Sequence, residues 1–106
     1  MEEQKKIIKD LISVGRAENL PEKERESNFT PFYGIPKRSA ADTSKIIILT
    51  EAFSTENEFF EFSLKDIGHI EEIETISDSD GRNAVKVRLW VKKGARAISS
   101  RSFVVE

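Results

Sequence analysis

AVKVRLWVKK, residues 84–93, alternates aliphatic and polar side chains without a break from residue 85 to residue 92. A period of two is typical of a β-strand that buries one face and exposes the other. The aliphatic members, predicted to point into a core, are Val85, Val87, Leu89 and Val91. The members predicted to point outward are Lys86, Arg88, Trp90 and Lys92. This segment therefore predicts a β-strand, and the neighbouring segments can be placed relative to it.

The residues before this strand predict its hairpin partner. DSDGRN, residues 78–83, is the strongest turn signal in the chain because it combines Asp, Ser, Gly and Asn. KDIGHIEEIETIS, residues 65–77, repeats isoleucine every third position, and Gly68 argues against a long helix there. We therefore predict a kinked turn that leads into a strand paired with residues 84–93.

The other strand signals complete an antiparallel region over residues 45–106. KIIILTEAF (45–53) and EFFEFSL (58–64) flank a turn of hairpin length, and SFVV (102–105) reads as a last short strand after a loop at 94–101. Because KIIIL is apolar on both faces, we predict that both faces of its strand are covered. The expected architecture is a bent antiparallel sheet, or a small partly open barrel, of about five strands.

The N-terminal part predicts a helix and a long connection. Residues 1–16 place Ile7, Ile8, Leu11 and Ile12 at helical spacing, which predicts an amphipathic helix packed on the sheet. Residues 17–44 hold all three prolines and show no clear period, so we expect a long connecting segment with a short helical turn. Its aromatic side chains Phe29, Phe32 and Tyr33 are expected to cover a face of the sheet. The predicted class is α+β, with residues 1–106 in a single domain.

Composition narrows the function classes. The 106 residues include no cysteine, which excludes a disulfide framework, a thiolate metal site and a cysteine nucleophile. The first ten residues mix acids with lysines and resemble no export signal, and no apolar run approaches the roughly 20 residues of a membrane helix. We therefore expect a cytoplasmic protein that does not enter a membrane.

Sequence motifs for catalysis or metal binding are incomplete. The single histidine, His69, lies near Asp66, Glu71 and Glu72, but this spacing matches no defined set of metal ligands. The chain has no GxSxG motif and no glycine-rich phosphate loop. We therefore expect no metal site, no cofactor and no enzymatic activity.

Charge is segregated along the chain although the net charge is only −2. Residues 51–80 carry ten acidic side chains and one lysine, whereas residues 81–106 carry seven basic side chains and one glutamate. One interpretation is that the acidic and basic segments pair across the sheet, with Glu71 and Glu74 beside the cations of residues 84–93. The other is a pair of surface patches of opposite sign, one of which docks a partner.

The functional prediction is an interaction or regulatory module that binds an acidic protein through a basic strand surface. Its predicted binding residues are Lys86, Arg88, Trp90, Lys92, Lys93 and Arg96, joined by Tyr33, Lys37 and Arg38 from the preceding segment. The alternative is binding of single-stranded nucleic acid, with a base stacked on Trp90 and cations on phosphates. That alternative requires an exposed Trp90. The sequence is also compatible with a homo-oligomer.

Overall fold

The computed structural model describes residues 6, 9, 22–39, 41–51, 53 and 58–106. Their elements are α2 (Glu22–Asn28), β1 (Phe29–Arg38), β2 (Lys45–Leu49), β3 (Phe59–Ser63), the 3₁₀ turn η1 (Leu64–Asp66), β4 (Ile67–Ser77), β5 (Asn83–Lys92), β6 (Arg96–Ile98) and β7 (Ser102–Val104). The predicted helix of residues 1–16 lies, except for Lys6 and Lys9, outside this described part. No helix in the described part is long and apolar enough to cross a membrane.

The seven strands form one open antiparallel sheet in the order β4-β5-β1-β2-β3-β6-β7. The predicted fold class, an N-terminal amphipathic helix on about five strands, is therefore wrong: the described fold is a seven-stranded sheet with the short helix α2. The two additional strands are β1, within the predicted connecting segment, and β6, within the predicted loop at 94–101.

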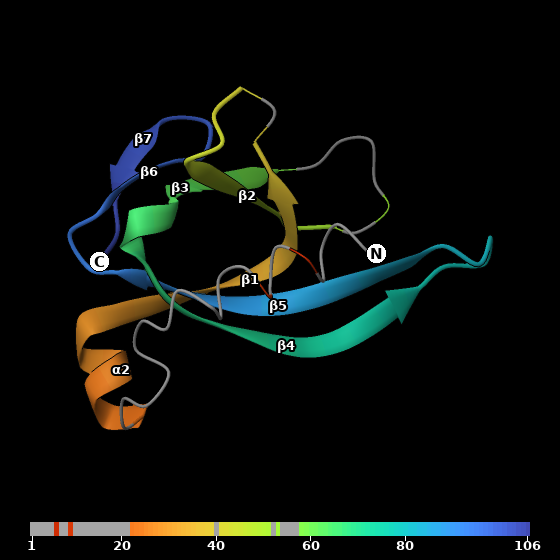
Figure 1. Ribbon diagram of the computed structural model, residues 1–106, viewed down its shortest axis with the longest axis horizontal. Coiled ribbons are helices and arrows are strands. Elements are labelled where there is room, and N and C mark those ends of the chain that lie inside the picture. The colour runs from red at the N-terminus through yellow and green to blue at the C-terminus, as the bar shows by residue number, and fades with distance from the viewer. Residues whose placement is uncertain (1–5, 7–8, 10–21, 40, 52, 54–57) are drawn as a thin grey trace.

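Strand β1 joins the two halves of the sheet. Phe29–Gly34 pairs with β5, and Ile35–Arg38 pairs with β2. In Figure 1, β1 runs from α2 along β5 and then curves toward β2. Each half of β1 thus has one partner strand among those described. A proline lacks a backbone N–H, but it loses no ladder hydrogen bond where its nitrogen faces the unpaired edge of that half. This arrangement explains how a segment containing Pro31 and Pro36 forms an interior strand of the sheet.

Gly34 stands where β1 changes partner. A Cβ atom placed there would lie 2.2 Å from the carbonyl oxygen of Leu49 and 2.6 Å from Cγ2 of Ile48. A side chain at this position would collide with the backbone of β2. Glycine therefore allows β1 to pass close to β2 at the bend between the two halves.

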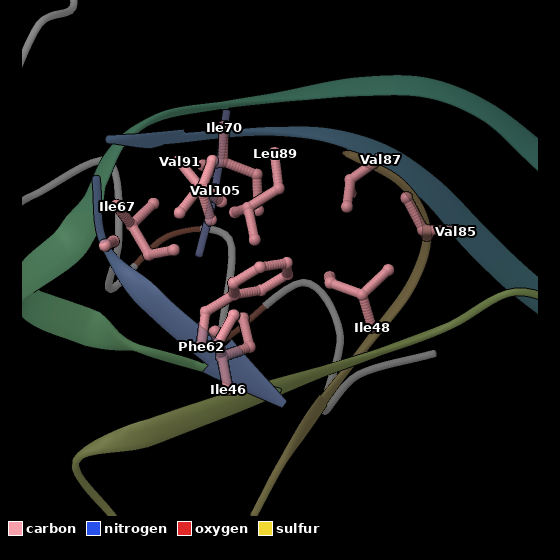
Figure 2. Close-up of a cluster of buried hydrophobic side chains, with 12 residues drawn as sticks. Ile46, Ile48, Phe62, Ile67, Ile70, Val85, Val87, Leu89, Val91 and Val105 are labelled. Atoms are coloured by element: carbon pink, nitrogen blue, oxygen red, sulfur yellow. The ribbon is translucent and has the colours of Figure 1, made fainter. Parts of the chain in front are cut away.

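The core lies between the two halves of the sheet, as the labelled side chains in Figure 2 show. The four side chains predicted to point inward from β5 are all buried: Val85, Val87, Leu89 and Val91. They meet Ile46 and Ile48 of β2, and Phe62 of β3, across the interior (Figure 2). The alternation in residues 85–92 thus identified the core-facing side of β5.

An aromatic cluster adjoins this core. The ring of Phe32 lies 4.7 Å from that of Phe62 and 5.2 Å from that of Phe60, centroid to centroid. Phe103 of β7 contacts the same group, with its ring 6.0 Å from that of Phe60. These contacts tie the outermost short strand β7 to β1 and β3.

The predicted turn at residues 78–83 is present between β4 and β5. The Asp78 carboxylate accepts hydrogen bonds from the backbone N–H groups of Asp80 and Arg82, and Gly81 has a positive φ of 81°. The Arg82 side chain also contacts this carboxylate, with Nε 2.6 Å from Oδ2. These local bonds explain why the short turn at residues 78–83 fixes the register of the β4–β5 hairpin.

Candidate functional site

The outward residues of β5 lie opposite the acidic side chains of β4. The register places Glu71 against Arg88 and Glu74 against Lys86. The interpretation that the acidic and basic segments pair across the sheet is therefore confirmed at these positions. Of the cations predicted to form a basic stripe on β5, Arg88 is thus paired with Glu71, and Lys86 lies beside Glu74.

Glu71 is the centre of a compact polar cluster. Its Oε1 atom accepts hydrogen bonds from Nε1 of Trp90 at 2.6 Å and from Nε of Arg88 at 3.1 Å. Its Oε2 atom accepts a second hydrogen bond from Arg88, donated by Nη2 at 2.8 Å. Arg25 of α2 adds an ion pair, with its Nη1 atom 3.5 Å from Oε1 of Glu71. One carboxylate thus links α2, β4 and β5.

The same contacts determine the ionisation of the cluster. The hydrogen bonds from Arg88 lower the pKa of Glu71 to about 2, against the cost of desolvation, and the bond from Trp90 adds to this effect. The bonds to Glu71, followed by the interaction with Tyr33, raise the pKa of Arg88. The pair is therefore fully charged at neutral pH, and it is a structural link rather than a proton donor or acceptor.

Trp90 is buried beneath this cluster and is only 4% exposed. The guanidinium of Arg25 lies 5.6 Å from the centre of its ring, and that of Arg88 lies 5.4 Å from it. Both distances are within the range of a cation–π contact. A ring enclosed in this way offers no surface on which a nucleic-acid base can stack.

A hollow of about 400 Å³ lies beside the cluster, between α2 and the outer faces of β1 and β5. Its walls include Tyr33, Arg88 and Lys93, which were predicted to bind a partner, but also the carboxylates of Glu26 and Glu106. Its charge is therefore mixed, and it is not the continuous basic surface that the sequence predicted.

Three more of the predicted binding residues lie in the other half of the sheet. Lys37 and Arg38 are at the end of β1 that pairs with β2, and Arg96 begins β6. Apart from Lys86 and Lys92, which lie elsewhere on β5, the predicted set thus divides between two places. One is the Glu71 cluster and its adjacent hollow; the other is the outer face of β1, β2, β3 and β6.

We call this second place the basic–apolar face; its residues are Lys37, Arg38, Lys45, Ile47, Leu49, Phe59, Glu61, Ser63, Arg96, Ile98 and Ser102. Two rows of cross-strand neighbours build it. Leu49 pairs with Phe59, and Ile47 pairs with both Lys37 and Glu61, which in turn pairs with Ile98. Apart from Arg38, which lies opposite the core residue Ile46, the strand residues of this face alternate with core residues and so point to the opposite side of the sheet.

The first hollow of this face has a volume of about 230 Å³ and is lined by Lys37, Arg38, Ile47, Leu49 and Phe59. Phe59 is 38% exposed, and Ile47 and Leu49 are half-buried. The strand KIIIL is thus fully buried on its core side and partly covered on its outer side. An apolar floor beside two cations is the kind of surface that proteins use to bind partners.

The second hollow has a volume of about 260 Å³, and its lining combines charged and hydroxyl side chains with apolar ones. Lys45, Ser63, Arg96 and Ser102 line it together with Glu61, Phe62, Ala97 and Ile98. Nζ of Lys45 lies 3.5 Å from Oε1 of Glu61. Arg96 is exposed, and no carboxylate among the described residues pairs with it.

The three apolar residues of the first hollow, Ile47, Leu49 and Phe59, were not among the predicted binding residues. In the sequence these residues form the second apolar face of a strand. That pattern is equally typical of a strand buried on both faces, so it does not indicate a binding surface. The exposure of that face depends on which elements cover it, and this information is not local to residues 45–49.

Side chains that could ligate a metal do not converge in the described part of the chain. No three His, Cys, Asp or Glu side chains there are arranged to hold a metal ion. His69 lies on β4, opposite Trp90. Comparisons with protein-family models, with curated proteins and with solved structures give no match for this chain.

Proposed function

We propose that the protein is a non-enzymatic interaction module that binds an acidic partner protein through the basic–apolar face. The observation that carries this proposal is the first hollow, where the side chains of Ile47, Leu49 and Phe59 lie beside Lys37 and Arg38. An exposed aromatic ring in such a hollow is a suitable anchor point for a partner side chain. The neighbouring cations favour partners with carboxylates around that side chain.

Charge complementarity supports an acidic partner. Lys37 and Arg96 are exposed on this face, and no carboxylate among the described residues pairs with either of them. The one glutamate of the face, Glu61, already contacts Lys45. The face therefore keeps an excess of positive charge, which attracts acidic surfaces at a rate that falls as salt increases.

The proposed surface differs from the one predicted on β5. Arg88 is engaged by Glu71, and Trp90 is buried, whereas Phe59 is accessible. The burial of Trp90 gives no support to the alternative of single-stranded nucleic acid, since stacking on that ring was its basis.

Selection from a random peptide library displayed on phage tests this proposal. We expect the purified protein to enrich peptides that combine acidic residues with at least one large apolar residue. A Phe59→Ser variant should lose these peptides, because it removes the aromatic anchor. Ile73→Ser is the matched control, because Ile73 is 45% exposed on β4, in the other half of the sheet.

Two results would overturn the proposal. One is enrichment of neutral or basic peptides alone. The other is equal retention of the selected peptides by the Phe59→Ser variant, once circular dichroism has shown that this variant folds.

A further inference from the structure

The two hollows of the basic–apolar face differ in chemistry but adjoin one another. The first has an apolar floor beside two cations, whereas the second also has hydroxyl groups and the Glu61 carboxylate in its lining. The row that joins Ile47, Glu61 and Ile98 across three strands runs from one to the other. A single segment of a partner can therefore reach both.

The sheet geometry gives the separation of the hollows. Their centres are offset by between one and two strand spacings and by about two residues along the strands, so they lie roughly 8–12 Å apart. An extended chain rises about 3.3 Å per residue and turns successive side chains to opposite faces, so the two side chains that enter the hollows are about two or four residues apart.

The second hollow suits a carboxylate. Arg96 supplies a planar set of donors that matches a carboxylate, whereas the charge of Lys45 is already offset by its contact with Glu61. The hydroxyl groups of Ser63 and Ser102 lie on the same wall and can donate further hydrogen bonds. Glu61 contacts Lys45 and leaves Arg96 as the cation with no carboxylate partner among the described residues.

We infer that the partner binds at two points: an apolar side chain enters the first hollow, and an acidic side chain two or four residues away, on the same face of the extended segment, enters the second. This inference rests on the proposed function and specifies the partner further. The partner segment is extended, carries an aromatic or large aliphatic anchor, and places an Asp or Glu against Arg96. The anchor provides adhesion, and the spacing provides selectivity.

A series of synthetic peptides measures the spacing directly. Each peptide has a Ser/Gly/Ala background, one Phe and one pair of adjacent Glu residues, and the separation of Phe from Glu varies in both orders. Binding is followed by fluorescence polarisation of a dye on the peptide. We expect the tightest binding when a Glu stands two or four residues from the Phe, because only an even separation in an extended chain puts both side chains on the same face.

Charge exchange then identifies the residue that meets the acidic group. The Arg96→Glu variant should bind the best peptide at least about fivefold more weakly, whereas a peptide with Lys in place of Glu should regain affinity for this variant. Lys92→Glu is the matched control, because Lys92 is an exposed cation on β5 and lies outside the basic–apolar face.

The outcomes separate this inference from the function on which it rests. If Phe59→Ser abolishes binding while all spacings bind alike and Arg96→Glu has no effect, the proposed function stands and the two-point recognition is wrong. If Phe59→Ser has no effect on any peptide, the proposed function fails as well. If Lys92→Glu weakens binding and Arg96→Glu does not, the surface lies on β5, and both proposals are overturned.

Discussion

Replacement of Glu71 by glutamine tests the carboxylate that links α2, β4 and β5. The change keeps the shape of the side chain but removes the charge that accepts two hydrogen bonds from Arg88 and one from Trp90. It also removes the ion pair with Arg25. The variant should therefore fold to the same structure with a weaker connection between the helix and the sheet.

Two lines of reasoning give the size of the loss. The pKa of Glu71 is about 2 instead of the usual 4.5, and a gap of that size corresponds to about 3 kcal/mol as an upper bound. The Glu71 and Arg88 side chains are about a third exposed, so solvent screening reduces this figure. Loss of hydrogen bonds to a charged group costs about 1.5–3 kcal/mol. We expect a loss of about 1–2 kcal/mol in the free energy of unfolding, or roughly 5–12 °C in melting temperature.

The pH dependence has a definite sign. Because the pKa of Glu71 is lower in the folded state, its ionised form stabilises the fold. This contribution is complete above a pH of about 4.5 and is lost as the pH falls toward about 2. The difference in stability between the wild type and the glutamine variant should therefore be largest near neutral pH and should shrink in acid.

Urea unfolding at neutral and acidic pH, followed by circular dichroism and by Trp90 fluorescence, measures this difference. Glu74→Gln is the control, because Glu74 is an exposed glutamate on the same strand, opposite Lys86. If the Glu71 variant loses less than about half a kcal/mol at neutral pH, or matches the Glu74 variant, Glu71 is an ordinary surface glutamate and the reasoning is refuted.

Three further changes probe the fold. Gly34→Ala should destabilise the protein by at least about 2 kcal/mol, because the new Cβ would lie 2.2 Å from the Leu49 carbonyl oxygen; a fully folded variant of unchanged melting temperature would contradict this. Gly68→Ala should cost about 1–3 kcal/mol in urea unfolding, because its Cβ would lie 2.3 Å from the ring of Phe29 and force that ring to move. Phe62→Ala should cost about 3–5 kcal/mol, since it empties a fully buried site; calorimetry showing a loss below about 1 kcal/mol would place Phe62 outside the core.

The β4–β5 hairpin was predictable because its signals are local. The alternation in residues 85–92 identifies the buried face, and the turn residues 78–83 fix where the chain reverses. Together they place Glu71 and Glu74 near the cations of β5, as the register confirms. The strand at 67–77 was also expected, with an irregular start that corresponds to η1 and to the register shift between Ile67 and His69.

Strand β1 was missed because its sequence carries signals against a strand. Pro31 and Pro36 are unfavourable in a strand that is paired on both sides, and Gly34 suggests a break. The structure resolves this conflict by pairing each half of β1 with a different partner. Such a division is a property of the assembled sheet, and it cannot be predicted from any short stretch of the sequence.

The candidate site was only partly predictable, for a similar reason. The sequence correctly placed Trp90 on the outward face of β5, but it could not show that Arg25 of α2 covers the ring. Lys37, Arg38 and Arg96 were predicted to bind a partner, yet the apolar floor formed by Ile47 and Leu49 reads as ordinary core in sequence.

The division of β1 between two partners also sets the order in which the chain can assemble. Its pairing with β2 joins nearby residues, whereas its pairing with β5 joins Phe29 to Lys92 and Gly34 to Val87, more than fifty positions apart. Closing so long a loop is the slow part of folding for a sheet of this kind. Trp90 lies at this late seam, opposite Pro31 and beneath Arg25, and it is the single tryptophan of the chain. In a refolding experiment its emission should therefore lag behind the far-ultraviolet signal of the local hairpins.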